Sequence, residues 1–219
     1  MNLDFLTPSA DAAVARSPME RSAADEGARF ELRDGWNIAV DYKSQPATDT
    51  VAWADVSHLT KVEFQAPSAR LDELAGQPLP FGTAVRGDEA WWCRLTSTRA
   101  LVIGGHPDDA PGIRQTDVTT TFAALTLVGP LAREVFARFS AIDLRPQVTP
   151  PGALRPGSIA RQPGIVICEA EDRYLMLFGW ATGEYVWAVV SDAGYHLGGR
   201  PIGIDALAKF PSAREAARA

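Results

Sequence analysis

The chain has 219 residues, which is enough for one large domain or two small ones. Apolar residues make up 46% of it and charged residues 22%, a balance that is typical of a folded globular protein and excludes a disordered one. The net charge of −6, without any basic tract, argues against nucleic acid or an anionic membrane as the main partner.

The N-terminal segment, residues 1–28, is predicted to be a partly flexible extension with helical character only in 19–28. Its first residues carry acidic side chains and no basic region, so they do not resemble a signal peptide. The two cysteines, Cys93 and Cys168, are far apart and belong to no CxxC pair, which favours free thiols in a reducing compartment. The histidines are isolated and indicate no metal site. We therefore expect a cytoplasmic protein without a membrane segment or metal.

The next segment has the pattern of a β-hairpin. Residues 29–33 and 36–40 are two short alternating runs, and the pair Asp34-Gly35 between them favours a tight two-residue turn.

The middle of the chain contains an internal repeat. Residues 55–57 (Asp-Val-Ser) precede a predicted strand at 61–65 and a proline at 67, and residues 117–119 (Asp-Val-Thr) precede a predicted strand at 124–128 and a proline at 130. Each proline is suited to the first turn of a helix, and each following segment has an apolar stripe.

Two further strands follow each of these helices. They are predicted at 89–94 and 99–103 after the first, and at 164–168 and 174–178 after the second, with an acidic turn at 169–173. A last helix at 183–193 is expected to end at Gly194 as a left-handed cap and to bury Tyr185, Val186, Val189 and Val190 before a closing strand near 201–204.

This order predicts an α+β fold made of two related ferredoxin-like split βαβ units. The proline-rich segment 146–156 reads as the connection between them. The predicted division is 1–28 for the extension, 29–145 for the first unit with its hairpin and repeat junction, 146–207 for the second unit and 208–219 for a C-terminal tail.

Four segments resemble one known family. They are residues 54–58 (Ala-Asp-Val-Ser-His) leading to 61–64, residues 124–133, residues 156–161, and residues 183–187 followed by 192–194 and 200–203. In this order they are similar to the folate-binding fold shared by the glycine-cleavage T-protein (aminomethyltransferase) and the gamma subunit of heterotetrameric sarcosine oxidase. The resemblance covers roughly 29–207 and lacks the C-terminal β-domain of the T-protein.

The resemblance implies a role in tetrahydrofolate-dependent one-carbon transfer from a methylated amine, as an aminomethyltransferase-like enzyme or an accessory subunit. It also implies a flavoprotein partner or a homo-oligomer, with no flavin bound by this chain alone. The alternative is a non-catalytic structural or assembly subunit of a flavin-dependent demethylase complex. The sequence leaves open whether the chain is itself an enzyme.

By position, the paired acids Asp88 and Glu89 fall where the family places its catalytic carboxylate. A carboxylate there could hydrogen-bond an amine nitrogen and stabilise an iminium-like cation as it forms. The alternative is a solvated turn before a strand, for which a Gly-Asp pair needs no further cause.

The cofactor-binding candidates are Glu171, Tyr174, Trp91 and His58. The T-protein motif Tyr-Thr-Gly-Glu falls on 167–175, where Glu171 and Tyr174 could stand in for two members and Leu175 replaces the second glutamate, so the pterin clamp is incomplete. Glu171 could accept two parallel N–H bonds from a pterin, Trp91 could stack on it, and His58 could transfer a proton. The alternatives are a charged hairpin tip for Glu171, core packing for the tryptophan and a structural role for the histidine.

Overall fold

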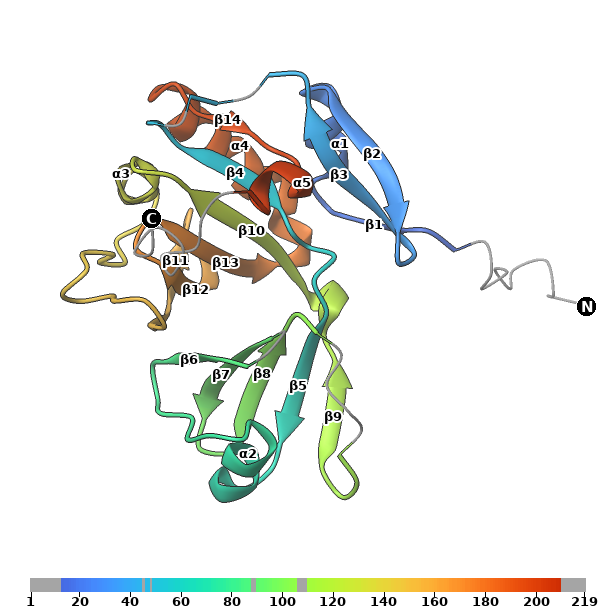
Figure 1. The fold of residues 1–219 in the computed structure, drawn as a ribbon, viewed down its shortest axis with the longest axis vertical. Coiled ribbons are helices and arrows are strands. Elements are labelled where there is room, and N and C mark those ends of the chain that lie inside the picture. The colour runs from blue at the N-terminus through green and yellow to red at the C-terminus, as the bar shows by residue number, and fades with distance from the viewer. Residues whose placement is uncertain (1–12, 45, 48, 88–89, 106–109, 210–219) are drawn as a thin grey trace, which may run out of the picture.

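The computed structural model describes residues 13–209 apart from 45, 48, 88–89 and 106–109 (Figure 1). Within that part of the chain, three β-sheets are accompanied by a few short helices, which confirms the predicted α+β class. None of the described helices has the length and apolar character to span a bilayer. The described residues also contain no group of three or more His, Cys, Asp or Glu side chains arranged to hold a metal ion.

The central sheet has six described strands and forms the middle of the molecule (Figure 1). In spatial order they are β11 (Leu154–Ile159), β12 (Gln162–Ala170), β13 (Arg173–Gly179), β10 (Phe122–Val128), β4 (Ala52–Asp55) and β14 (Arg200–Pro201). All neighbours are antiparallel except β4 and β14, which run parallel. The sheet takes strands from both predicted units, and the division at residue 145 stays a prediction.

The outer sheet is built from one continuous part of the chain. Its described strands are, in order, β6 (Ala84–Arg86), β7 (Trp91–Thr96), β8 (Arg99–Ile103), β5 (Lys61–Gln65) and β9 (Arg114–Asp117). Helix α2 (Ser68–Leu74) begins directly after Pro67 and buries Leu71, as the sequence pattern predicts.

The N-terminal sheet contains the predicted hairpin. Its order is β1 (Ala15–Arg16), β3 (Trp36–Tyr42) and β2 (Ala28–Arg33). Asp34 and Gly35 both have positive φ, 49° and 78°, as a two-residue turn of this kind requires. Helix α1 (Glu20–Asp25) lies within the segment for which helical character is predicted.

Both faces of the central sheet are buried. On one face, α1, α3 (Ala132–Ala137) and α4 (Gly183–Tyr195) pack on side chains such as Leu125 and Phe178, and we call this the helix-side core. On the other face, residues such as Leu175 and Leu177 pack against Cys93 and Leu101 of the outer sheet, and we call this the intersheet core. Because β13 is covered on both faces, nearly every residue along it is apolar.

The chain passes between the two large sheets twice, at residues 55–61 and 117–124, and the internal repeat marks both crossovers. Asp55 Oδ1 accepts the Ser57 N–H at 2.9 Å, and Asp117 Oδ1 accepts the Thr119 N–H at 2.8 Å. The sequence repeat is therefore a repeat of structure, with the same aspartate turn in each copy.

The two crossovers also bond to each other reciprocally. The Val56 N–H donates to the Ala124 carbonyl and the Val118 N–H donates to the Lys61 carbonyl, both at 2.9 Å. The Ala124 N–H donates to Ser57 Oγ at 3.1 Å, and the Lys61 N–H donates to Thr119 Oγ1 at 2.9 Å. The 3₁₀ turn η3 (Thr119–Thr121) completes the second crossover before β10.

Helix α4 differs from its prediction at its C-terminal end and on one face. It follows the 3₁₀ turn η4 (Trp180–Thr182) and continues through Gly194 to Tyr195. Its buried side chains include Val186, Trp187 and Val190, whereas Tyr185 is 46% exposed. The residue with left-handed φ after the helix is Gly198, at 77°. Short helix α5 (Ile204–Leu207) follows β14 in place of a longer closing strand.

Candidate functional site

The predicted catalytic pair, Asp88 and Glu89, lies outside the described residues. The strands on either side of the pair, β6 and β7, run antiparallel, with Arg86 paired to Trp91. The assignment of the two carboxylates therefore stays a prediction.

Trp91 lies at the boundary between the outer and central sheets. Its ring is partly buried against the intersheet core, and its Nε1–H donates to Glu169 Oε1 at 2.9 Å. The Arg86 guanidinium lies over the same ring, 5.1 Å from its centroid, in a cation–π arrangement. The indole is thus held by a carboxylate at its edge and a cation on its face.

Glu169 lies at a β-bulge near the end of β12, on the face of the central sheet that meets the outer sheet. The register between β12 and β13 shifts between Cys168 and Ala170, and Glu169 is the residue at the shift. Val166 and Cys168 belong to the helix-side core and Ile167 to the intersheet core, so strand alternation directs Glu169 towards the outer sheet. Glu169 Oε2 accepts from Arg173 Nε at 3.0 Å, and Arg173 Nη1 donates to the Leu207 carbonyl of α5 at 3.5 Å. We call Trp91, Glu169 and Arg173 the boundary cluster.

Glu171 and Tyr174 do not join this cluster. Tyr174 is 1% exposed in the helix-side core, and its hydroxyl donates to the Glu171 backbone carbonyl at 2.7 Å. Burial raises the pKa of the Tyr174 hydroxyl to about 12, so it remains a donor at neutral pH. The side chain of Glu171 is exposed at the tip of the β12–β13 hairpin.

Trp91 and Tyr174 therefore lie on opposite faces of the central sheet, and the structure does not bring them together. The Trp91 N–H donates to Glu169, and the Tyr174 hydroxyl donates to a backbone carbonyl. This arrangement does not fit a pterin held jointly by Glu171, Tyr174 and Trp91.

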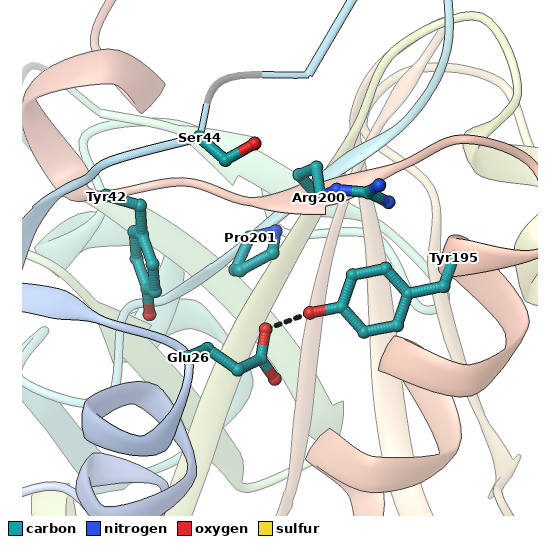
Figure 2. A pocket seen from close by; sticks show the side chains of 6 residues that line it. All are labelled: Glu26, Tyr42, Ser44, Tyr195, Arg200 and Pro201. Carbon is teal, nitrogen blue, oxygen red and sulfur yellow. Dashed lines mark hydrogen bonds between the residues drawn. The ribbon is translucent and has the colours of Figure 1, made fainter.

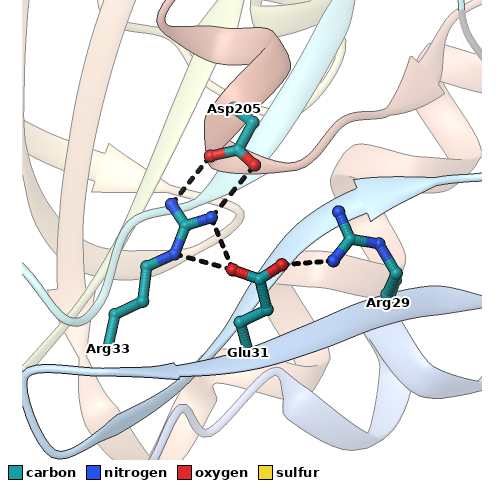
Figure 3. A network of polar contacts seen from close by, with 4 residues as sticks. All are labelled: Arg29, Glu31, Arg33 and Asp205. Carbon is teal, nitrogen blue, oxygen red and sulfur yellow. Dashed lines mark hydrogen bonds and ion pairs between the residues drawn. The ribbon is translucent and has the colours of Figure 1, made fainter.

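His58 lies in the first crossover and is not part of the boundary cluster. Burial and the positive charges of Lys61 and Arg33 lower its pKa to about 4, against a smaller opposing effect of Asp34. The histidine is therefore neutral at physiological pH. The nearby Arg33 pairs bidentately with Asp205 of α5, at 2.7 and 3.0 Å (Figure 3).

Figure 3 also shows how that arginine belongs to a longer network. Arg33 Nε donates to Glu31 Oε2 at 3.0 Å, and Glu31 pairs with Arg29 through its other oxygen. The network links the β2–β3 hairpin of the N-terminal sheet to α5.

The sequence interpretation missed Glu169, Arg173 and Arg86. Residues 169–173 read as an acidic turn, but the strands extend to Ala170 and from Arg173, which leaves only two residues in the turn. The available signal was an acidic residue between two apolar ones, Cys168 and Ala170, at the end of a predicted strand.

No protein-family model matches the sequence, and no curated protein matches it in a sequence comparison. Solved structures do match the fold. One chain of the heterotetrameric sarcosine oxidase from Corynebacterium sp. U-96, in complex with pyrrole 2-carboxylate, has a TM-score of 0.66 and 18% sequence identity. That match covers 84% of this chain and 96% of the other.

The glycine cleavage system aminomethyltransferase T from Bartonella henselae has a TM-score of 0.65 and 14% identity. The match covers 88% of this chain and 60% of that enzyme, so the present chain spans slightly less than two thirds of it. These likenesses confirm the resemblance to the T-protein and sarcosine oxidase family at the level of the fold. Fold alone does not fix an activity.

Proposed function

We propose that this chain is an accessory subunit of a hetero-oligomeric, flavin-dependent amine oxidase in the cytoplasm, with a structural role in its assembly. The observation that carries the proposal is the extent of the match. The chain accounts for 96% of one chain of a heterotetrameric sarcosine oxidase and for 60% of the glycine cleavage system aminomethyltransferase T. As part of this proposal, the chain consists of two related ferredoxin-like units, 29–145 and 146–207, which both contribute strands to the central sheet.

The boundary cluster supports a structural role over a catalytic one. Glu169 places one oxygen on Trp91 and the other on Arg173, at 2.9 and 3.0 Å. A carboxylate that is shared between two donors from different elements ties those elements together. Glu169 thus ties the outer sheet to the central sheet and, through Arg173, to α5.

The experiment is isolation of the full chain with an affinity tag from its native source. We expect a flavoprotein to co-elute in a fixed ratio, with flavin absorbance in the same fraction. Elution of the chain alone, or as a homo-oligomer without flavin, would overturn the proposal.

A second candidate is direct participation in tetrahydrofolate-dependent one-carbon transfer. It is favoured by one feature, the half-buried indole of Trp91 that follows the acidic pair Asp88-Glu89 in sequence. Titration of the isolated chain with tetrahydrofolate, followed by tryptophan fluorescence, separates the two candidates. Saturable quenching that is lost in Asp88→Ala selects folate binding, and an unchanged signal selects the assembly role.

A further inference from the structure

An open cavity of about 470 Å³ lies on the helix side of the molecule, far in sequence from the boundary cluster (Figure 2). It is formed where the end of α1, the end of β3, the end of α4 and strand β14 meet. Its lining residues are Glu26, Tyr42, Ser44, Tyr195, Arg200 and Pro201. The volume is within the range of small-molecule sites, roughly 300–1,000 Å³.

Arg200 supplies the positive charge of this cavity. Its Nη1 donates to the Gly199 carbonyl at 2.7 Å, and its guanidinium lies over the Tyr195 ring, 5.1 Å from the centroid. Among the described residues, no carboxylate forms an ion pair with Arg200. A guanidinium carries five N–H donors, so most of its donor capacity is unused by the described side chains.

Glu26 supplies the negative charge on the other side of Tyr195 (Figure 2). Its Oε1 accepts from Trp187 Nε1 at 2.7 Å and from Ser191 Oγ at 3.4 Å, and its Oε2 accepts from the Tyr195 hydroxyl. A carboxylate has about four lone-pair positions, so one position on Oε2 is left by these three described donors. The bond to Glu26 fixes the Tyr195 ring beneath Arg200.

Two glycines on either side of β14 let the segments around the cavity pack closely together. A Cβ on Gly203 would lie 2.0 Å from the Val40 carbonyl carbon, and a Cβ on Gly199 would lie 2.5 Å from Val51 Cγ1. The residues that flank β14 are therefore closely packed, with Gly203 against β3 and Gly199 against the residue before β4. This close packing fixes the backbone on both sides of β14, so little backbone freedom is lost there on binding.

We propose that this cavity binds a small zwitterion of the α-amino-acid class. Arg200 takes the ligand carboxylate through its unused N–H donors, and Glu26 Oε2 accepts from the ligand ammonium. The apolar part of the ligand packs between Tyr42 and Pro201. The reason for a zwitterion is electrostatic: an anion alone would meet the Glu26 charge, and a cation alone would meet Arg200. The site is separate from the assembly role proposed above.

The test is isothermal titration calorimetry of the full chain with each standard amino acid. For the amino acid that binds most tightly, we expect its amide and its deaminated acid to bind at least about tenfold more weakly, because each loses one charge-assisted contact. No binding by any of them would overturn the proposal.

Two variants assign the charges. Arg200→Gln should abolish the preference for the amino acid over its amide, and Glu26→Gln should abolish the preference over the deaminated acid. Arg138→Gln is the matched control, because Arg138 pairs with Glu134 on the exposed face of α3. Circular dichroism verifies that each variant is folded. Preferences that survive both substitutions would show that the ligand binds elsewhere and would overturn the assignment.

Discussion

At the residue scale, His58 shows how a side chain suited to proton transfer is held in one protonation state. It is partly buried and close to two cations, Lys61 and Arg33, and burial is the largest cause of its lowered pKa. A histidine that binds no proton until about pH 4 is a poor proton carrier at neutral pH. Its surroundings therefore favour a structural role over proton transfer.

We predict that His58 makes the fold sensitive to acid. Between about pH 6.5 and pH 4 the unfolded chain binds a proton at this histidine and the folded chain does not, so falling pH favours unfolding. The loss is at most about 3 kcal/mol, from a pKa shift of about 2.5. Urea unfolding of the wild type and of His58→Gln across this range measures it. The difference between the two free energies of unfolding should change with pH, and parallel curves would rule the effect out.

The same scale shows why the boundary cluster could not be predicted. The sequence identifies Trp91 as a stacking candidate, but its actual partner, Glu169, belongs to another sheet and lies 78 residues away in the chain. Strand alternation assigns Glu169 to one face, but only the packing of the two sheets shows that Trp91 meets it there. Tyr174 illustrates the complementary case, since its place in the alternating run 174–178 assigns it to a face, whereas only the packed structure shows which core covers that face.

At the element scale, the strands were predicted more accurately than the end of α4. The hairpin at Asp34-Gly35 and strand β5 follow from period-two alternation and turn chemistry, which are local. A glycine near the end of a helical pattern, such as Gly194, is consistent both with a helix cap and with close packing against a neighbouring side chain. Its actual role is contact, because a Cβ there would lie 2.4 Å from a ring carbon of Trp53. Local sequence does not distinguish the two roles.

We predict that Gly194→Ala destabilises the protein by about 1–3 kcal/mol through overpacking against Trp53. The gain in helix propensity, about 1 kcal/mol, acts in the opposite direction and is included in the measured value. Gly179→Ala is the matched control, since a Cβ at Gly179 meets nothing within 4 Å. Chemical denaturation should separate the two variants. Equal stability of both would mean that Trp53 moves aside without cost.

At the scale of the whole molecule, the two crossovers join the central and outer sheets into one unit. Lys61, which has no exposed surface, lies between them and donates to the Ser57 and Leu59 carbonyls at 2.9 and 2.8 Å. Burial lowers the pKa of its ammonium to about 8. The second repeat has Ala124 at the position of Lys61, so only the first crossover contributes a buried cation at this position. The repeat in sequence predicted the paired strands but not their reciprocal bonding, which depends on contacts between segments 62 residues apart in the chain.

Because the two crossovers bond to each other in the same way, we predict that breaking the equivalent bond in either one costs a similar amount of stability. Ser57→Ala and Thr119→Val each remove a hydroxyl that accepts a buried backbone N–H, from Ala124 and from Lys61 respectively. Each change should therefore lower the free energy of unfolding by about 1–3 kcal/mol, and by similar amounts, because the lost bond occupies the same place in each repeat. Thr96→Val is the control, since Thr96 is exposed and accepts the Thr98 N–H at 3.3 Å on the outer sheet. Urea denaturation followed by circular dichroism should give one cooperative transition in every case. A large cost at one crossover and none at the other would show that only one of them holds the sheets together, and the repeat would then be symmetric in geometry without being symmetric in energy.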